Sequence, residues 1–158
     1  MSVRAASFRL FIENPIALSA ITSWFLAQTI KSAIMLLRTK RRNSKEILKT
    51  FAWRTGGMPS SHAALVSAMT ASIAVKEGIH SNLFVLSFFM ALVIMRDAMG
   101  VRRSSGIQAK SLNSLGKSME ERMGVEYHAV KEVQGHTPLE VVIGALLGIF
   151  IAAAYAYL

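Results

Sequence analysis

The chain of 158 residues has the length of one domain. Hydrophobic residues make up 53% of it and charged residues 17%, whereas a soluble domain usually carries about a quarter charged residues. The net charge is +9, but the basic residues lie between long apolar runs, which favours a membrane protein over a nucleic-acid binder. The absence of cysteine excludes disulfides, thiol catalysis and thiolate metal sites.

We therefore predict an all-α integral membrane protein that forms a single membrane domain over residues 1–158. The N-terminal basic residues resemble those of a signal peptide, but Glu13, Asn14 and Pro15 interrupt the apolar run behind them. An uncleaved first span is therefore expected. Four apolar segments have lengths suited to transmembrane helices in a bundle, the second and third being short. These segments are 16–37, 59–75, 83–97 and 138–158.

Two basic connections separate these segments, one between Arg38 and Met58 and one between Ala98 and Gly135. With four spans, both connections lie on the same side of the membrane. The positive-inside rule makes that side cytoplasmic and places both termini outside. We therefore expect a multi-pass protein of the cell membrane.

The stretch 106–123 carries apolar residues near helical spacing among polar ones, which predicts an amphipathic helix lying at the membrane interface. In the last span, Gly144 and Gly148 form a small-residue face suited to close helix contact. Such a face is compatible with a homodimer.

Ionisable and hydroxyl-bearing residues gather at the four segment ends that meet on the cytoplasmic side. Ionisable groups are costly at membrane depth. The segment Gly56-Gly57-Met58-Pro59-Ser60-Ser61-His62 predicts a glycine turn followed by a helix N-terminus. Free N–H groups beside serine hydroxyls form an anion site there. His62, one turn in, can donate a proton. The alternative is a serine-capped turn with no further role.

The segment from His136 to Glu140 has two interpretations that both stay open. Thr137 and Glu140 form a capping box with Pro138 at the first helical position. Alternatively, Glu140 hydrogen-bonds His136 across one helical turn, fixes its tautomer and raises its basicity.

Further charged residues lie at the remaining ends. Lys31 and Arg38 are two turns apart and fall on nearly one helix face, and Gln28 extends this polar stripe. Asp97 precedes Arg102 and Arg103, and we expect it to hold one of these arginines rather than to react. His80 and His128 receive no role.

Lys31-x6-Arg38, Pro59-Ser60-Ser61-His62 and His136-x3-Glu140 follow the order of the three signature motifs of the type 2 phosphatidic acid phosphatase superfamily. Those motifs are Lys-x6-Arg-Pro, Pro-Ser-Gly-His and Ser-Arg-x5-His-x3-Asp. Over about residues 10 to 158 the chain resembles the divergent branch described as acid phosphatase/vanadium-dependent haloperoxidase related.

The chain departs from the family pattern at four positions. Thr39 stands at the motif-one proline, Ser61 at the motif-two glycine and Glu140 at the usual aspartate. Val130 occupies the position of the motif-three arginine, so Lys131, Arg102 or Arg103 would have to supply that charge. The main family also carries six helices, two more than the four spans counted here.

The resemblance implies a membrane lipid-phosphate phosphatase, a hydrolase that needs neither metal nor cofactor. His136 would be the nucleophile, Glu140 its partner and His62 the proton donor. The phosphoryl group of a phospholipid or isoprenoid phosphate would be bound by a wider set: Lys31, Arg38, Gly57, Ser60, Ser61, Arg102, Arg103 and Lys131. Two alternatives stay open: a non-catalytic phospholipid- or phosphate-binding membrane protein, and a small transporter or assembly subunit.

Overall fold

The computed structural model describes residues 9–38, 57–133 and 135–157. All regular secondary structure in these ranges is helical, which confirms the all-α prediction. A short helical segment at 9–13 precedes five long helices. These are α2 (Pro15–Arg38), α4 (Ser61–Glu77), α5 (Asn82–Met99), α6 (Val101–Met123) and α7 (Pro138–Ala156).

Local sequence determines where the helices begin. Pro15 occupies the first position of α2, and the side-chain oxygen of Asn14 accepts the N–H of Ile16 at 2.8 Å. Ser60 caps α4 and Ser81 caps α5, each through a side-chain oxygen that accepts an N–H of the first turn. These caps satisfy N–H groups that have no carbonyl partner inside the helix.

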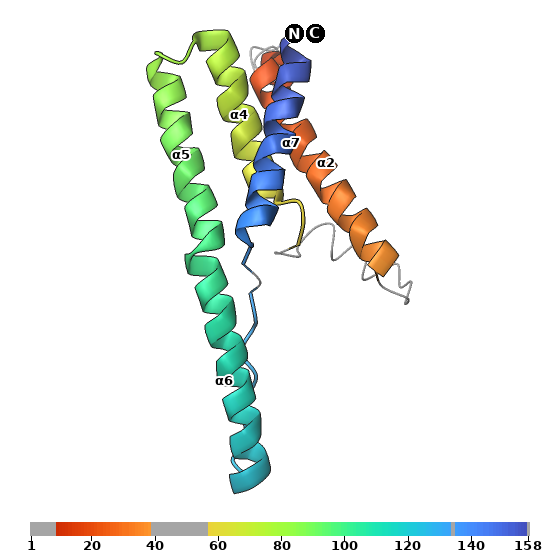
Figure 1. Cartoon of the computed structure of the whole chain (residues 1–158), viewed down its shortest axis with the longest axis vertical. Helices are drawn as coiled ribbons and strands as arrows, with labels where there is room; N and C mark the ends of the chain where they lie inside the picture. The colour runs from red at the N-terminus through yellow and green to blue at the C-terminus, as the bar shows by residue number, and fades with distance from the viewer. Residues whose placement is uncertain (1–8, 39–56, 134, 158) are drawn as a thin grey trace.

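Helix α4 is the central helix and packs against α2, α5 and α7 (Figure 1). Its contact with α7 uses the small-residue face predicted from the sequence. A Cβ atom at Gly144 would overlap the carbonyl oxygen of Ser60, and one at Gly148 would overlap that of Ala64. Close backbone approach through small residues is typical of membrane helices. This face therefore serves packing within the chain, and a homodimer would have to use another surface.

Small polar residues link the helices inside the bundle. The hydroxyls of Ser19 and Ser72 lie 2.7 Å apart between α2 and α4, and those of Thr22 and Tyr155 lie 2.9 Å apart between α2 and α7. Large apolar residues face outward instead: Leu86, Phe89 and Val93 of α5 are each at least 60% exposed. A polar, small-residue interior with an apolar exterior is the pattern expected of helices that contact lipid.

Three helical stretches have the length and composition to cross a membrane: Pro15–Leu37, Asn82–Met123 and Pro138–Ala156. Helix α4 has 17 residues and lies between them. Its length of about 26 Å is close to the roughly 30 Å of a bilayer core. Helices α2, α4, α5 and α7 pack into one bundle, to which all three of these stretches contribute.

The amphipathic helix predicted after the third span is present as α6, but it continues α5 instead of crossing the end of the bundle (Figure 1). The helical hydrogen bonds continue through the junction, because Gly100 donates to Arg96 and Ser104 donates to Gly100. Helix α6 therefore projects beyond the bundle. Residues 124–133 return along it toward α7 (Figure 1).

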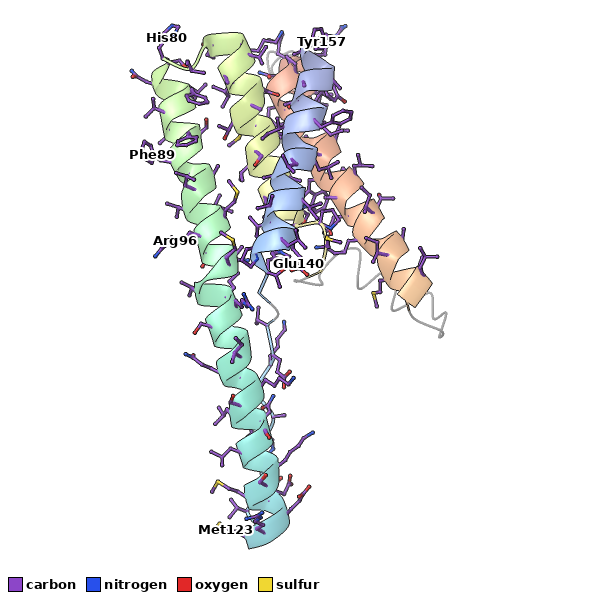
Figure 2. All side chains as sticks on the ribbon, in the orientation of Figure 1. His80, Phe89, Arg96, Met123, Glu140 and Tyr157 are labelled. Atoms are coloured by element: carbon purple, nitrogen blue, oxygen red, sulfur yellow. The ribbon has the colours of Figure 1, made fainter. Side chains whose placement is uncertain are left out.

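The two ends of the bundle differ in chemistry. The start of α2, the end of α7 and the turn between α4 and α5 lie at one end, and the start of α4, the end of α5 and the start of α7 lie at the other. Figure 2 shows Glu140 at the opposite end from His80 and Tyr157. The basic residues predicted between Lys40 and Arg54, and Thr39, lie outside the described residues.

Candidate active site

The loop before α4 is joined to the start of α7 by a backbone hydrogen bond. The N–H of Ser60 donates to the carbonyl oxygen of Glu140 at 3.0 Å. Gly57 has a φ of 87°, the conformation that its glycine identity allows. A Cβ atom at Gly57 would lie 3.9 Å from Cγ of Lys31, so this loop runs against α2. The loop, α2 and α7 therefore meet at one place.

His136 is fixed by the backbone around it. Its N–H donates to the carbonyl oxygen of Ala98 in the last turn of α5, at 3.0 Å. A Cβ atom at Gly135 would overlap the backbone of Arg103, so the chain passes closely over the start of α6. The His136 residue is 6% exposed. A histidine held by its own backbone in this way has a defined position at the end of the bundle.

Glu140 combines the two roles that the sequence left as alternatives. The capping box is present, since Glu140 Oε2 accepts the N–H of Thr137 at 2.9 Å and the Glu140 N–H reaches Thr137 Oγ1 at 3.4 Å. The same Oε2 atom lies 3.4 Å from Nδ1 of His136. This second contact is long for a hydrogen bond. It nevertheless turns Nδ1 toward the carboxylate, so Nε2 lies on the opposite edge of the ring.

Electrostatic interactions connect five residues that come from α2, α4, α6, α7 and the preceding loop. His62 interacts with Arg102 and Lys31, His136 interacts with Lys31, Glu140 and His62, and Lys31 interacts with Glu140. The two histidines, 74 positions apart in the sequence, are therefore close enough to interact electrostatically. We call this group the histidine cup, and its members are Lys31, His62, Arg102, His136 and Glu140.

Lys31 is the buried cation of the histidine cup. Only 6% of it is exposed, and within the described ranges its ammonium group has no hydrogen-bond or ion-pair partner. A cation withdrawn from water is costly without an anion close to it. Glu140 supplies part of the compensation through the electrostatic interaction. Lys31 therefore has capacity to bind a further anion.

The environment of His136 keeps its imidazole neutral. Burial lowers the pKa of His136 below its usual value, and the positive charge of Lys31 lowers it further. The hydrogen bond and negative charge of Glu140 act in the opposite direction but do not overcome burial. A neutral imidazole at neutral pH has a free lone pair and can act as a nucleophile or a base.

Asp97 contacts Arg102, one of the two arginines that we expected it to hold. The Asp97 Oδ2 and Arg102 Nε atoms lie 2.6 Å apart, with side chains 38% and 47% exposed. The ion pair lies across the α5–α6 junction, beside His62. Arg103 contacts the cup region through its backbone at Gly135, and its side chain is exposed.

Val130 and Lys131 lie far from the histidine cup. The N–H and carbonyl of Val130 both bond the side chain of Asn113, at 2.9 and 3.0 Å. Asn113 stands 13 residues beyond Gly100, which corresponds to about 20 Å along α6. The motif-three arginine position is therefore outside the cup, and Arg102 is the cation that the structure brings there in place of Lys131.

Three other predicted phosphate-binding residues lie at helix ends. Ser61 is 2% exposed at the first position of α4, and Ser60 is fully buried as its cap. Arg38 ends α2, two turns beyond Lys31, and its side chain lies outside the described part of the chain. Among the described residues, no group of three or more His, Asp or Glu side chains could hold a metal ion.

Asn113 is not among the residues predicted from the sequence, although its side chain anchors the segment that leads to His136. Besides its two bonds to Val130, its amide receives the hydroxyl of Tyr127 at 2.7 Å and donates to Glu132 at 2.8 Å. The only sequence signal was a small polar residue on an amphipathic helix, and such residues usually face water.

The fold and the site define a polytopic α-helical membrane protein that carries a paired-histidine, cationic site at one end of its bundle. The chain belongs to the Divergent PAP2 family, whose model matches residues 12–151. This confirms the resemblance drawn from the three motifs. The chain is similar to the uncharacterized membrane protein YuiD of Bacillus subtilis (strain 168), with 35% identity over 151 residues that cover 89% of this chain and 92% of the relative. No solved structure matches.

Proposed function

We propose that the protein is a metal-independent membrane phosphatase that hydrolyses lipid phosphates through a phosphohistidine intermediate. The single observation that carries this proposal is the meeting of His62 and His136 beside the buried cation Lys31. Membership of the Divergent PAP2 family supports it. Two imidazoles and a buried cation at the end of an apolar bundle match the needs of phosphoryl transfer at a membrane.

In the first step, Nε2 of His136 attacks the phosphorus atom. The bond between phosphorus and the lipid oxygen breaks, and protonated His62 donates its proton to the leaving alkoxide. The products of this step are the lipid alcohol and a phosphohistidine. Glu140 faces Nδ1, so it orients the ring and stabilises the positive charge that develops on it. For a lipid pyrophosphate, the leaving group is the lipid monophosphate.

In the second step, water attacks the phosphohistidine. His62, now neutral, accepts a proton from that water, inorganic phosphate leaves and both histidines return to their starting states. Lys31 and Arg102, with N–H groups at the start of α4, stabilise the charge on the phosphoryl oxygens. Arg38 and Ser61 are further candidates for this task by their positions.

The substrate is a lipid because the site lies at the end of an apolar bundle, where a headgroup can enter while its hydrocarbon chains stay in the bilayer. We place the site on the cytoplasmic face, because both predicted basic connections share its side of the membrane. The reaction needs no metal ion in this mechanism, so activity should persist in the presence of a chelator.

The experiment measures phosphate release from phosphatidate and from an isoprenoid phosphate by purified protein in detergent with EDTA. His136→Ala and His62→Ala should each lose at least about a hundredfold in kcat, since nucleophilic and acid-base groups contribute on this scale. His128→Ala is the matched control, because His128 is exposed and outside the cup. With radiolabelled substrate, wild type should form an alkali-stable, acid-labile phosphoprotein that His136→Ala lacks. Full turnover by folded His136→Ala would refute the proposal.

A second candidate function is non-catalytic binding of a phospholipid or phosphate, and the placement of Val130 favours it. The position that carries a phosphate-binding arginine in the superfamily holds valine here, outside the cup. If wild-type protein binds a lipid phosphate with micromolar affinity and releases no phosphate, the binding function replaces the enzymatic one. Lys31→Met should then abolish binding.

A further inference from the structure

Two buried oxygen atoms on α2 have no hydrogen-bond partner within the described ranges. They are Oε1 of Gln28, a residue that is 6% exposed, and Oγ of Ser32. Buried polar groups in proteins are almost always paired, because an unpaired one loses its hydration and gains nothing in return. The cost is greater inside a membrane bundle, where water is scarce. Two such atoms one helical turn apart point to a group that binds there.

Their position relates them to the histidine cup. Gln28 precedes Lys31 by three residues and Ser32 by four, so all three lie on neighbouring parts of one helix surface. Ser19 of α2 lies opposite Ser72 of α4, and the helices run antiparallel (Figure 1). Gln28 is therefore at the level of the first turn of α4, one turn deeper in the bundle than Lys31.

We propose that Gln28 and Ser32 form a second subsite beside the histidine cup, which accepts a hydrogen bond from a hydroxyl group next to the phosphate ester of the lipid substrate. This inference rests on the proposed function and specifies its substrate class. The preferred substrate is a lipid phosphomonoester with a free hydroxyl near the phosphate, rather than an isoprenoid phosphate or a fully acylated glycerol phosphate.

The chemistry of the unpaired atoms selects this class. The carboxamide oxygen of Gln28 only accepts hydrogen bonds, so it cannot bind the unprotonated phosphoryl oxygens, which also only accept. It needs a donor, and a hydroxyl is the donor that lipid phosphates commonly carry. Lys31 binds the phosphoryl group one turn away. A substrate hydroxyl on the adjacent carbon would then reach Gln28 and Ser32, and burial would make the loss of that bond costly to an analogue without it.

The test compares 1-oleoyl lysophosphatidate, which has a free 2-hydroxyl, with its 2-deoxy analogue, 3-oleoyloxypropyl phosphate. Both are presented in mixed micelles with EDTA, and kcat/KM is measured for each. Wild type should prefer the hydroxylated lipid by about tenfold, the ratio expected for one neutral hydrogen bond. Gln28→Met keeps the side-chain volume and removes the acceptor. It should lower kcat/KM about tenfold for lysophosphatidate and leave the deoxy analogue unchanged.

Gln108→Met is the matched control, because Gln108 is exposed on α6. It should keep the wild-type preference for the hydroxylated lipid. Thermal unfolding provides an independent readout. If Gln28 serves a ligand and not the fold, Gln28→Met should unfold at the same temperature as wild type or a higher one, because it removes an unpaired buried group. A melting temperature more than a few degrees below wild type would assign Gln28 to packing and overturn the proposal.

Equal kinetic effects of Gln28→Met on the two lipids, or no preference in wild type, would also overturn the subsite. Failure of the proposed function is a different result, namely no phosphate release from either lipid by wild type. In that case equilibrium binding of the two lipids to wild type and Gln28→Met tests the subsite directly. Tighter binding of lysophosphatidate that Gln28→Met abolishes would support it, and equal binding would refute it.

Discussion

The backbone N–H of Ser60 donates to the carbonyl oxygen of Glu140 at 3.0 Å, so the second and third sequence motifs are joined by their main chains. The bond does not depend on either side chain. It fixes the start of α4 against the start of α7, and His62 and His136 are each within four residues of it. The relative position of the two histidines is therefore determined by helix packing.

Gly144 supports this junction, because a Cβ atom there would overlap the carbonyl oxygen of Ser60. We expect Gly144→Ala to separate α4 from α7, lower the free energy of unfolding by about 1–3 kcal/mol and reduce phosphatase turnover at the same time. Thermal unfolding in detergent and phosphate release measure the two effects. Ala153→Val enlarges an exposed position of the same helix and should change neither. Normal stability of Gly144→Ala would contradict the packing argument.

The two roles of Glu140 can be separated by mutation. Thr137→Ala removes one half of the capping box and keeps the contact between Glu140 and His136. It should cost about 1 kcal/mol of stability with kcat within a few-fold of wild type. Glu140→Gln keeps a hydrogen-bonding cap but loses the negative charge, and we expect a fall in kcat of about tenfold or more. If Glu140→Gln loses only stability, the capping role alone explains this residue.

The pKa of His136 sets the acidic limit of activity. Burial lowers this pKa below the usual 6.5, and catalysis needs the neutral imidazole. As the pH falls, the decline in kcat/KM that comes from protonation of His136 should therefore begin only below 6.5. Glu140 raises the pKa of His136, so Glu140→Gln should move the acidic limb to still lower pH. An acidic limb above pH 6.5 in the wild-type profile would contradict this assignment.

The sequence predicted the helices well because apolar segments and their caps are local signals. Thr137 and Pro138 mark a helix start that the structure also has, whereas α4 begins at Ser61, two residues after the predicted start at Pro59. The grouping of Lys31, His62 and His136 could be predicted because four antiparallel helices bring alternate ends together. The path of α6 could not be predicted, since amphipathic spacing is the same whether a helix lies flat or continues its neighbour through Gly100.

The cation that lies near the histidines in place of the motif-three arginine could not be predicted from the sequence either. Lys131 is adjacent in sequence to Val130 and was therefore a natural replacement, but segment 127–132 is bound to Asn113, and this removes Lys131 from the site. Arg102 reaches His62 from the α5–α6 junction instead. Sequence spacing cannot reveal this exchange, because the two cations come from different elements and only tertiary contacts decide between them.

This exchange predicts unequal effects of removing the two cations. Arg102→Ala should lower kcat/KM by about ten- to a hundredfold, since a charge that stabilises the phosphoryl oxygens acts in the transition state. Lys131→Ala should stay within about twofold of wild type. Asp97→Asn removes a partly exposed ion pair and should cost less than about 1 kcal/mol of stability. Steady-state kinetics on one lipid phosphate measure the first two effects, and thermal unfolding measures the third. A larger kinetic loss for Lys131→Ala than for Arg102→Ala would contradict the assignment.

Asn113 is expected to act on His136 from a distance, through the segment that joins them. Its side chain makes four hydrogen bonds to Tyr127, Val130 and Glu132, and Glu132 precedes His136 by four residues. Asn113→Ala leaves these groups unpaired and releases the segment, so the imidazole loses its fixed position.

A displacement of about 1 Å in a reacting group can cost a hundredfold in rate. We therefore expect Asn113→Ala to lower kcat by about ten- to a hundredfold with little change in KM, because Lys31 and Arg102 lie outside the segment that this substitution releases. Ser114→Ala, at the exposed neighbouring position, is the control. Hydrogen exchange of the 127–133 amides should accelerate in Asn113→Ala only. Wild-type kcat in a variant whose segment exchanges rapidly would show that His136 is held by its bond to Ala98 alone.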